Sequence, residues 1–391
     1  MNWNDKTAAN VKAIKPSGIR KFFDIAAQVK GVLSLSIGEP DFAAPDKVLA
    51  AMKVSLDAKE TSYTGNSGMM ELREAISHHF EQRYGVHYDP KDEILVTVGV
   101  SEGLAMALLA ITEPGDEVII PDPAYVAYPA SVELAGGTPV FVPTYPEHDF
   151  KLTVEALEKV ITPKTKAIVI GYPNNPTGTV MSAEELMPIA KFAEEHDLIV
   201  LSDEIYCELM YGDAKFTSFA KLPGMRERTV IFNGFSKAYA MTGMRLGYVC
   251  APREGLAPIL KLHQYAIMCA NTTAQVGGIT ALKECDDDVE AMRQEYDRRR
   301  KVIYKGLCDM GLPVFEPKGA FYIFPDIRCT GMTSAEFCEK LVQEEKVAVV
   351  PGTAFGDQGE GFVRISYAAS MDTIQEALKR MARFVAKYRK D

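Results

Sequence analysis

The sequence predicts an α/β protein: a large domain with a mostly parallel seven-stranded sheet between helices, and a smaller α+β domain. Between about residues 90 and 250, apolar runs rich in Val and Ile alternate with stretches of helical spacing. This alternation is typical of parallel strands connected by helices. After about residue 285 a long charged helical stretch is followed by short strands, which indicates a second unit. A length of 391 residues accommodates both.

The strands of the large domain are predicted from short apolar runs. Several of these runs are apolar at consecutive positions, which suits strands that are buried on both faces. Helical spacing between them predicts three helices, and Ser101 and Ser182 are acceptable N-caps. The predicted strands are Ile94–Val98, Glu117–Pro121, Thr138–Val142, Lys166–Ile170, Leu198–Ser202, Thr229–Phe232 and Leu246–Ala251, and the predicted helices are Glu102–Ile111, Thr153–Ile161 and Ser182–His196.

The smaller domain is predicted from the C-terminal third and one N-terminal strand. Leu33–Ser36 is a short strand too isolated to form a sheet alone, so we expect residues 1–40 to join residues 286–391, with residues 41–285 forming the large domain. The predicted helices are Asp287–Met310, Thr333–Glu345 and Asp372–Tyr388, and the predicted strands are Ala320–Pro325, Val347–Val350 and Gly361–Ser366.

Charge and composition narrow the possible partners. With 43 basic and 53 acidic residues the formal charge is −10, which disfavours binding to nucleic acid. Residues 1–10 lack the apolar core of a signal peptide, and the apolar stretch Leu104–Ile111 is too short to span a membrane. The seven scattered cysteines contain no C-x-x-C pair, and the six histidines show no metal-ligand spacing. We expect reduced core thiols in a cytoplasmic protein that has no metal site.

A lysine follows one of the predicted strands at the point where open α/β sheets bind ligands. Lys237 lies just past the strand Thr229–Phe232, between Ser236 and an arginine eight residues further on, Arg245. A lysine there can form a Schiff base with an aldehyde cofactor, while the serine and the arginine hold a phosphate. The alternative is a solvated lysine in a glycine-containing loop.

The ends of three other predicted strands carry groups that could bind such a cofactor. Asp203 ends an apolar strand and can pair with a protonated pyridine nitrogen, with Tyr206 near the ring hydroxyl; alternatively, Asp203 caps the next helix. The run Asn174–Gly178 offers an amide but is also a plain turn, and Gly99–Ser101 forms a strand–glycine–helix turn that suits a phosphate. Because these groups converge on one sheet edge, together they match pyridoxal 5′-phosphate.

The chain resembles the class I/II aminotransferases, which are fold-type I pyridoxal-phosphate enzymes. The resemblance covers nearly the whole length and is greatest to the bacterial branch of aspartate, aromatic and N-acetyl-diaminopimelate aminotransferases. It rests on five motifs: Ser36–Phe42 (SIGEPDF), Asn174–Gly178 (NNPTG), Ser202–Tyr206 (SDEIY), Ser236–Arg245 (Ser-Lys-x₇-Arg) and Phe362–Ser366 (FVRIS).

The resemblance implies a role for each group around the cofactor ring. Lys237 carries the cofactor as an internal aldimine and later moves the proton between the substrate Cα and the cofactor. Asp203 partners the pyridine nitrogen, Tyr206 and Asn175 contact the ring oxygen, and Tyr125 stacks on the ring. Tyr125 could alternatively be a core tyrosine. The reaction implied is ping-pong transfer of an amino group from an L-amino acid to a 2-oxo acid such as 2-oxoglutarate.

The resemblance also implies a phosphate site that is completed by a second subunit. The backbone amides of Val100 and Ser101 hold the phosphate with the side chains of Ser236 and Arg245. Tyr63 matches a phosphate ligand that arrives from the neighbouring subunit, so the active unit is expected to be a homodimer.

The substrate side of the site matches the family with two departures. Arg364 matches the residue that binds the substrate α-carboxylate, with Gly38 and Asn175 close to the same group. A lone arginine in a strand is otherwise often a surface ion pair. The turn Gly99–Glu102 lacks the lysine that some relatives carry after it. A second arginine for a dicarboxylate side chain is also missing, which argues against strict aspartate specificity.

Two alternatives to a transaminase remain open from the sequence. A carbon–sulfur β-lyase or a cyclopropane-type synthase shares the same cofactor site, and a non-catalytic cofactor-binding module is disfavoured by the intact Lys237 and Arg364. The segment Ile14–Phe23 is expected to line the substrate pocket, where Ile19 and Phe22 favour apolar side chains and Lys15 or Arg20 a carboxylate. The same segment could simply pack against the small domain.

Overall fold

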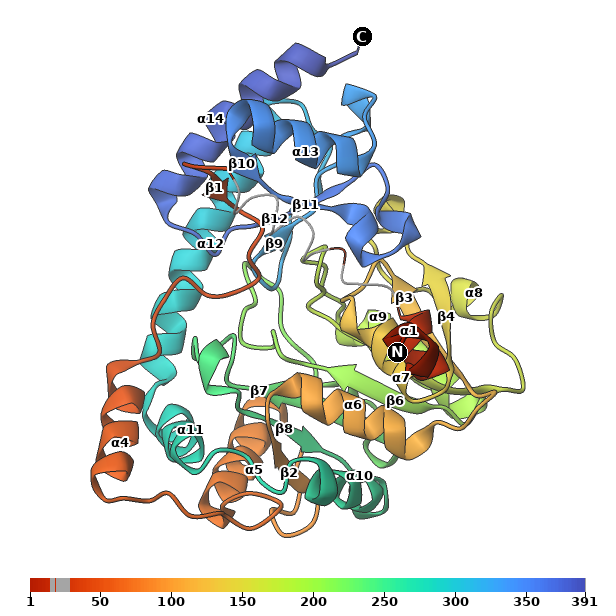
Figure 1. The fold of residues 1–391 in the computed structure, drawn as a ribbon, viewed down its shortest axis with the longest axis vertical. Helices are drawn as coiled ribbons and strands as arrows, with labels where there is room; N and C mark the ends of the chain where they lie inside the picture. Colours follow the sequence, from red (N-terminus) through yellow and green to blue (C-terminus); the bar gives the residue numbers. More distant parts are fainter. Residues whose placement is uncertain (15–17, 19–28, 391) are drawn as a thin grey trace.

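The computed structural model describes residues 1–14, 18 and 29–390. A seven-stranded sheet with order β2-β8-β7-β6-β5-β3-β4 forms the centre of the larger part (Figure 1). Its strands are β2 (Ile94–Thr97), β3 (Glu117–Asp122), β4 (Thr138–Pro143), β5 (Thr165–Ile170), β6 (Ile199–Asp203), β7 (Thr229–Gly234) and β8 (Gly247–Cys250). All neighbours are parallel except β8, which is antiparallel to β2 and β7. The predicted mostly parallel seven-stranded sheet is therefore confirmed.

Helices cover both faces of this sheet because alternate strand residues point to opposite sides. In β5, Ala167 and Val169 pack with the first group of helices, whereas Ile168 and Ile170 pack with the second. The first group is α6 (Val100–Ile111), α7 (Ala127–Leu134) and α10 (Arg253–Ala266). The second is α5 (Met70–Tyr84), α8 (Val154–Leu157), α9 (Ala183–Glu195) and α11 (Thr272–Glu284), with α4 (Asp46–Asp57) packed on α11.

The smaller part is built around short strands covered by long helices. The long helix α12 (Asp286–Asp309) runs from the large sheet's helices into this part (Figure 1). Its other elements are α13 (Ser334–Glu345), α14 (Met371–Tyr388), β1 (Leu33–Ser34), β9 (Tyr322–Ile323), β10 (Val347–Ala348), β11 (Val350–Pro351) and β12 (Val363–Ser366). The N-terminal strand β1 pairs with β10, and β11-β12-β9 form a second sheet. The proposed domain limits at residues 40 and 285 stay predictions.

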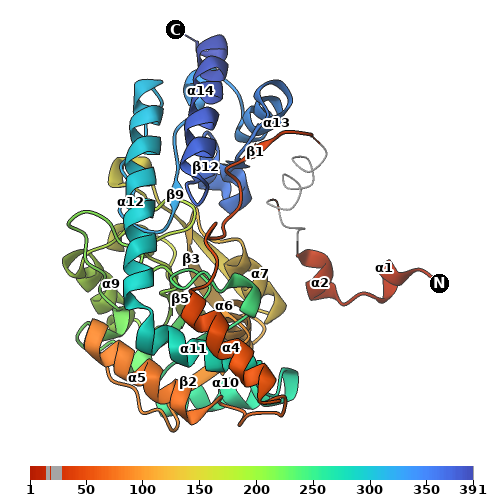
Figure 2. The same cartoon turned by 90° about the vertical axis from the view of Figure 1, so that its left-hand side faces the viewer.

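The remaining elements are short. Helices α1 (Trp3–Lys6) and α2 (Ala9–Ala13) lie in an arm that extends to one side in Figure 2. The arm contacts the body at α7, where Asn10 donates a hydrogen bond to the carbonyl of Leu134 over 3.3 Å. The 3₁₀ turns are η1 (Pro146–His148), η2 (Phe219–Lys221), η3 (Arg226–Arg228), η4 (Thr242–Met244), η5 (Arg328–Thr330), η6 (Gly352–Phe355) and η7 (Asp357–Gly359). Within the described part of the chain, no helix combines the length and the apolarity that crossing a membrane requires.

Several predicted elements differ in the structure. The strand predicted over Ala320–Pro325, for example, is only the two residues of β9. Helix α6 begins at Val100 with Gly99 as its N-cap, not after Ser101. The helix predicted over Thr153–Ile161 is only the four residues of α8, because residues 158–165 turn to enter β5. The strand predicted over Val347–Val350 is two strands, since the chain leaves one sheet and joins the other at Val349.

The expected burial of all cysteines is wrong in part. All seven are free, and Cys207, Cys250, Cys285 and Cys338 are buried. Cys308 is exposed, however, while Cys269 and Cys329 are half-buried. Cys308 lies near the C-terminal end of α12, where one face of the helix meets solvent, so its position does not require burial.

Helix α6 lies unusually close to the sheet, and a glycine makes this possible. A Cβ at Gly103 would lie 2.6 Å from Cγ2 of Val249. Gly103→Ala should therefore lower the free energy of unfolding by about 1–3 kcal/mol through overpacking, measured by chemical denaturation. Gly255→Ala in α10 is the matched control, because its Cβ would make ordinary contacts with Ala251 at 3.8 Å and Pro252 at 3.9 Å. It should stabilise by up to about 1 kcal/mol; equal stabilisation by both changes would contradict the packing account.

Candidate active site

A cavity of about 690 Å³ opens at the carboxyl ends of β5, β6 and β7, where open α/β sheets bind ligands. Apart from Tyr63, the residues that the sequence singled out for the site and that the structure describes line this cavity. They are Gly38, Val100, Ser101, Tyr125, Asn175, Asp203, Tyr206, Ser236, Lys237, Arg245 and Arg364. The fold therefore brings together groups from seven separate regions of the sequence.

Lys237 presents its amine to the cavity. It follows β7, and its Nζ donates a hydrogen bond to the carbonyl oxygen of Gly38 over 2.7 Å. Burial lowers the pKa of Lys237 to about 8, and the positive charge of Arg364 adds to this effect. A substantial fraction of the amine is consequently neutral near physiological pH, as a nucleophile or a general base requires.

Asp203 lies at the end of β6 at the base of the cavity. Its Oδ2 accepts a hydrogen bond from the Tyr128 hydroxyl over 2.8 Å, and its Oδ1 accepts one from the backbone of Ile205 over 3.2 Å. Burial raises the pKa of Asp203, although both hydrogen bonds and Lys237 oppose the rise. In the described part of the chain no basic side chain forms an ion pair with it. A cationic ligand group in the cavity would complete this environment.

Arg364, on β12, is the second buried charge of the site. Only 2% of the residue is exposed, and burial lowers its pKa. Nη1 donates to Oδ1 of Asn175 over 3.0 Å and Nη2 to the carbonyl of Ser36 over 2.6 Å, while Nε has no partner. Among the described residues no carboxylate pairs with this guanidinium. Because Arg364 is buried and has no such partner, it is not part of a surface ion pair. An anionic ligand in the cavity would compensate its charge.

Aromatic rings surround Arg364. Its guanidinium carbon lies 4.5 Å from the ring centre of Tyr322 and 4.8 Å from that of Phe355. The hydroxyl groups of Tyr322 and Tyr206 are 2.8 Å apart. Sequence reasoning assigned no role to Tyr322 or Phe355. Tyr125 lines the same cavity and hydrogen bonds with Ser101.

The start of α6 forms an anion-binding turn. Gly99 has φ +77°, and a Cβ there would lie 2.6 Å from Nη2 of Arg245, so the backbone and the arginine meet only because this residue is glycine. The amides of Val100 and Ser101 open the helix beside Ser236, and all three residues line the cavity. A helix N-terminus with an adjacent guanidinium suits a phosphate group.

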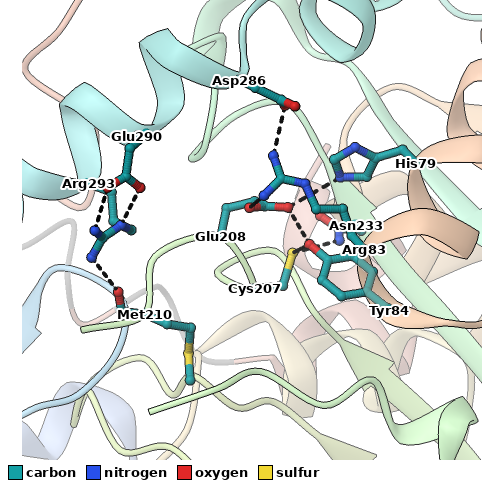
Figure 3. Close-up of polar contacts among 10 residues, drawn as sticks. All are labelled: His79, Arg83, Tyr84, Cys207, Glu208, Met210, Asn233, Asp286, Glu290 and Arg293. Carbon is teal, nitrogen blue, oxygen red and sulfur yellow. Dashed lines mark hydrogen bonds and ion pairs between the residues drawn. The ribbon is translucent and has the colours of Figure 1, made fainter. Parts of the chain in front are cut away.

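The loop that follows β6 is held from behind by a separate polar cluster (Figure 3). Glu208 accepts a hydrogen bond from His79 of α5 over 3.2 Å, and Arg293 of α12 donates to the carbonyl of Met210 over 3.1 Å. Burial alone would raise the pKa of Glu208, but the hydrogen bond from His79 helps to lower it overall. Helices α5 and α12 thus fix the loop 203–211 that carries Asp203 and Tyr206.

Two further predictions concern other residues. Tyr63 does not line it and is 77% exposed, so its own subunit gives it no contact with the site. Lys15, Ile19, Arg20 and Phe22, which were expected at the substrate pocket, lie outside the described residues.

The cavity provides a partner for each group of pyridoxal 5′-phosphate. The buried amine of Lys237 would react with its aldehyde, the buried carboxylate of Asp203 would pair with its protonated ring nitrogen, and the α6 turn with Arg245 would hold its phosphate. The unpaired guanidinium of Arg364 remains for a second, anionic ligand.

Comparisons with known proteins identify the family. A family model described as aminotransferase class I and II matches residues 30–381. A putative aminotransferase of Bacillus subtilis is 53% identical and covers 96% of this chain and 97% of its own. An aspartate aminotransferase of Pyrococcus abyssi is 51% identical over 94% and 95% of the two chains. The crystal structure of an aromatic aminotransferase from Pyrococcus horikoshii matches with a TM-score of 0.90 at 49% identity, over 94% and 99%.

The extent of these matches, over nearly the full length of each chain, agrees with the cavity that the structure forms. The chain therefore belongs to the class I and II aminotransferases, a family of enzymes that use pyridoxal 5′-phosphate.

Proposed function

We propose that this aminotransferase moves the amino group of an L-amino acid of the aspartate, aromatic or diaminopimelate type to a 2-oxo acid such as 2-oxoglutarate, in two half-reactions. The observation that carries the proposal is the pairing of two groups in one cavity: a buried, unpaired guanidinium at Arg364 and a low-pKa amine at Lys237. One group recognises an α-carboxylate, and the other can move the proton at the neighbouring carbon.

The roles of the residues follow from their positions. Arg364 holds the substrate α-carboxylate in a two-point contact and thereby orients the Cα–H bond toward Lys237. Lys237, released as a free amine, takes the proton from the substrate Cα. In the second half-reaction it returns a proton to the Cα of the 2-oxo acid. When bound, pyridoxal 5′-phosphate supplies an electron sink for the negative charge that develops at Cα. Asp203 keeps the pyridine nitrogen protonated, which keeps that sink effective, and Tyr128 orients the Asp203 carboxylate.

The remaining site residues hold the cofactor in place. We assign Val100, Ser101, Ser236 and Arg245 to the phosphate, because they surround the start of α6. Tyr125 lies where it can stack on the ring. Tyr206 and Asn175 contact the ring oxygen, and Asn175 and the backbone of Gly38 contact the substrate carboxylate beside Arg364.

The choice of amino donor depends on the outer part of the cavity. The cations among the described lining residues are Lys237, Arg245 and Arg364, all of which have a role above. An acidic substrate side chain would therefore need a cation from the segment 15–28 or from a second subunit. Similar chains carry names for both aspartate and aromatic substrates. We place the enzyme in the cytoplasm, because its seven free cysteines are typical of a reducing compartment.

The absorption of the bound cofactor tests the proposed reaction. Adding the preferred amino acid alone, from a panel of aspartate, aromatic and diaminopimelate donors, should bleach the visible band in one turnover. Adding 2-oxoglutarate should restore it, because the amino group left on the enzyme needs an acceptor. Release of pyruvate or ammonia without bleaching would instead identify a lyase.

The low pKa of Lys237 predicts how the apoenzyme takes up its cofactor. Only the neutral amine attacks the aldehyde, so the loading rate should rise with pH through a midpoint near 8. Replacing Arg364 by leucine should move this midpoint upward, because it removes a positive charge that lowers the Lys237 pKa. Stopped-flow absorbance measures both profiles, and a midpoint that stays in place in Arg364→Leu would contradict the electrostatic account.

The two-point contact of Arg364 is tested by a charge-conserving change. Arg364→Lys should raise KM for both the amino acid and the 2-oxo acid by roughly 10- to 100-fold, since a lysine cannot make the paired hydrogen bonds. Arg380→Lys is the matched control, because Arg380 pairs with Glu376 on the outer side of α14. Its KM values should equal those of the wild type. Unchanged KM values in Arg364→Lys would show that another group binds the carboxylate.

We further propose that the enzyme is a homodimer in which Tyr63 reaches the phosphate of the neighbouring site. A large exposed ring outside its own cavity supports this arrangement. Tyr63→Phe should weaken cofactor binding about tenfold. In hybrids of Tyr63→Phe and Lys237→Ala subunits, one site then has both intact residues and should regain wild-type cofactor affinity. A hybrid that keeps the Tyr63→Phe affinity would show that Tyr63 acts within its own subunit.

A further inference from the structure

A buried carboxylate joins the two loops that flank the cavity. Asp122 ends β3, and its Oδ2 accepts hydrogen bonds from the backbone N–H groups of Asp357 (3.1 Å) and Gln358 (3.4 Å). Two residues further on, the N–H of Ala124 donates to the carbonyl of Phe355 over 2.9 Å. We call these five residues the Asp122 clasp. It connects the end of β3 to the loop between β11 and β12.

The contact is close enough to exclude any side chain on the opposite loop. Gly356 has φ +135°, and a Cβ there would lie 1.8 Å from Oδ1 of Asp122. The backbone of this glycine therefore lies directly against the carboxylate. The loop approaches β3 so closely only because residue 356 is glycine.

A carboxylate is a costly choice for this position. Asp122 is only 5% exposed, and burial raises its pKa to about 6, with the negative charge of Asp357 adding to the rise. Its Oδ1 is buried without a hydrogen-bond partner, and among the described residues no cation pairs with it. An uncharged asparagine could accept the same two backbone hydrogen bonds with a smaller desolvation cost. The hydrogen bonds of the clasp therefore depend on the acceptor oxygen at this position and not on its negative charge.

Each end of the clasp adjoins a group of the active site. On one side, Tyr125 follows Ala124 directly and lines the cavity. On the other side, the ring of Phe355 lies 4.8 Å from the guanidinium carbon of Arg364. The clasp therefore joins the loop that carries Tyr125 to the loop whose Phe355 ring contacts Arg364.

We propose that Asp122 is a positioning residue, which holds the Phe355 loop against the Tyr125 loop and so keeps Arg364 aligned with the cofactor. The proposal rests on the function proposed above, in which Arg364 holds the α-carboxylate. Both the amino acid and the 2-oxo acid carry this carboxylate. Loss of the clasp consequently weakens the binding of both substrates by the same factor, whatever their side chains.

The test uses purified holoenzyme and steady-state kinetics with both substrates varied. Asp122→Ala should raise the two KM values by a common factor of about ten or more, with a much smaller change in kcat. Asp122→Asn keeps an acceptor for the two N–H groups and should recover most of the loss. Gly356→Ala breaks the clasp from the opposite loop and should reproduce the phenotype of Asp122→Ala, which keeps the test decisive if one variant folds poorly.

A matched control separates positioning from general destabilisation. Asp326 is another buried carboxylate of the smaller part, where it accepts a hydrogen bond from the backbone of Arg328 and lies outside the cavity. Asp326→Ala should lower thermal stability and leave both KM values unchanged. The proposal would be overturned if the clasp variants contained less active enzyme but kept wild-type KM values. It would also be overturned if KM rose for only one of the two substrates.

These outcomes are distinguishable from failure of the proposed function. If the wild type does not bleach with any donor, the transamination proposal fails. If the wild type does transaminate and Asp122→Ala and Gly356→Ala both keep its KM values, only the role of the clasp is overturned.

Discussion

A buried guanidinium without a carboxylate partner is the interaction on which the site depends. Arg364 lies between the rings of Tyr322 and Phe355, and its polar partners among the described residues are neutral oxygen atoms. Such a charge is costly in a protein interior unless an anion compensates it. The cavity is therefore poised to take a carboxylate, and the same positive charge lowers the pKa of Lys237. The charge of Arg364 thus adds to the larger effect that burial has on the amine of Lys237.

The fold supplies these groups from separate layers. The parallel strands end in Asp203 and the Lys237 loop at one edge of the large sheet, while Arg364 comes from β12 of the smaller part. The loop 203–211 is fixed from behind by α5 and α12, and the Asp122 clasp connects β3 to the loop beside Arg364. Catalytic geometry thus depends on contacts between the two parts, which no single element provides.

The sequence predicts strand-end groups well and contacts between distant segments poorly. Lys237 and Asp203 could be identified because each follows an apolar strand. The hydroxyl contact between Tyr206 and Tyr322 joins residues that are 116 positions apart in the sequence. The clasp joins residues that are 235 positions apart. Neither contact can be predicted from a local sequence pattern. Likewise, Val347–Val350 reads as one strand, because only the partners of its two ends show that it divides between two sheets.

The central claim is that Lys237 removes the proton from the substrate Cα. Exchange of this proton tests the claim most directly, because it isolates that step from the rest of the reaction. An amino acid deuterated at Cα is incubated with holoenzyme in ordinary water, and loss of deuterium is followed by mass spectrometry. The account predicts rapid exchange by the wild type and none by Lys237→Ala, with partial recovery when a small primary amine is added. Exchange by Lys237→Ala at the wild-type rate would contradict it, because another group would then move the proton.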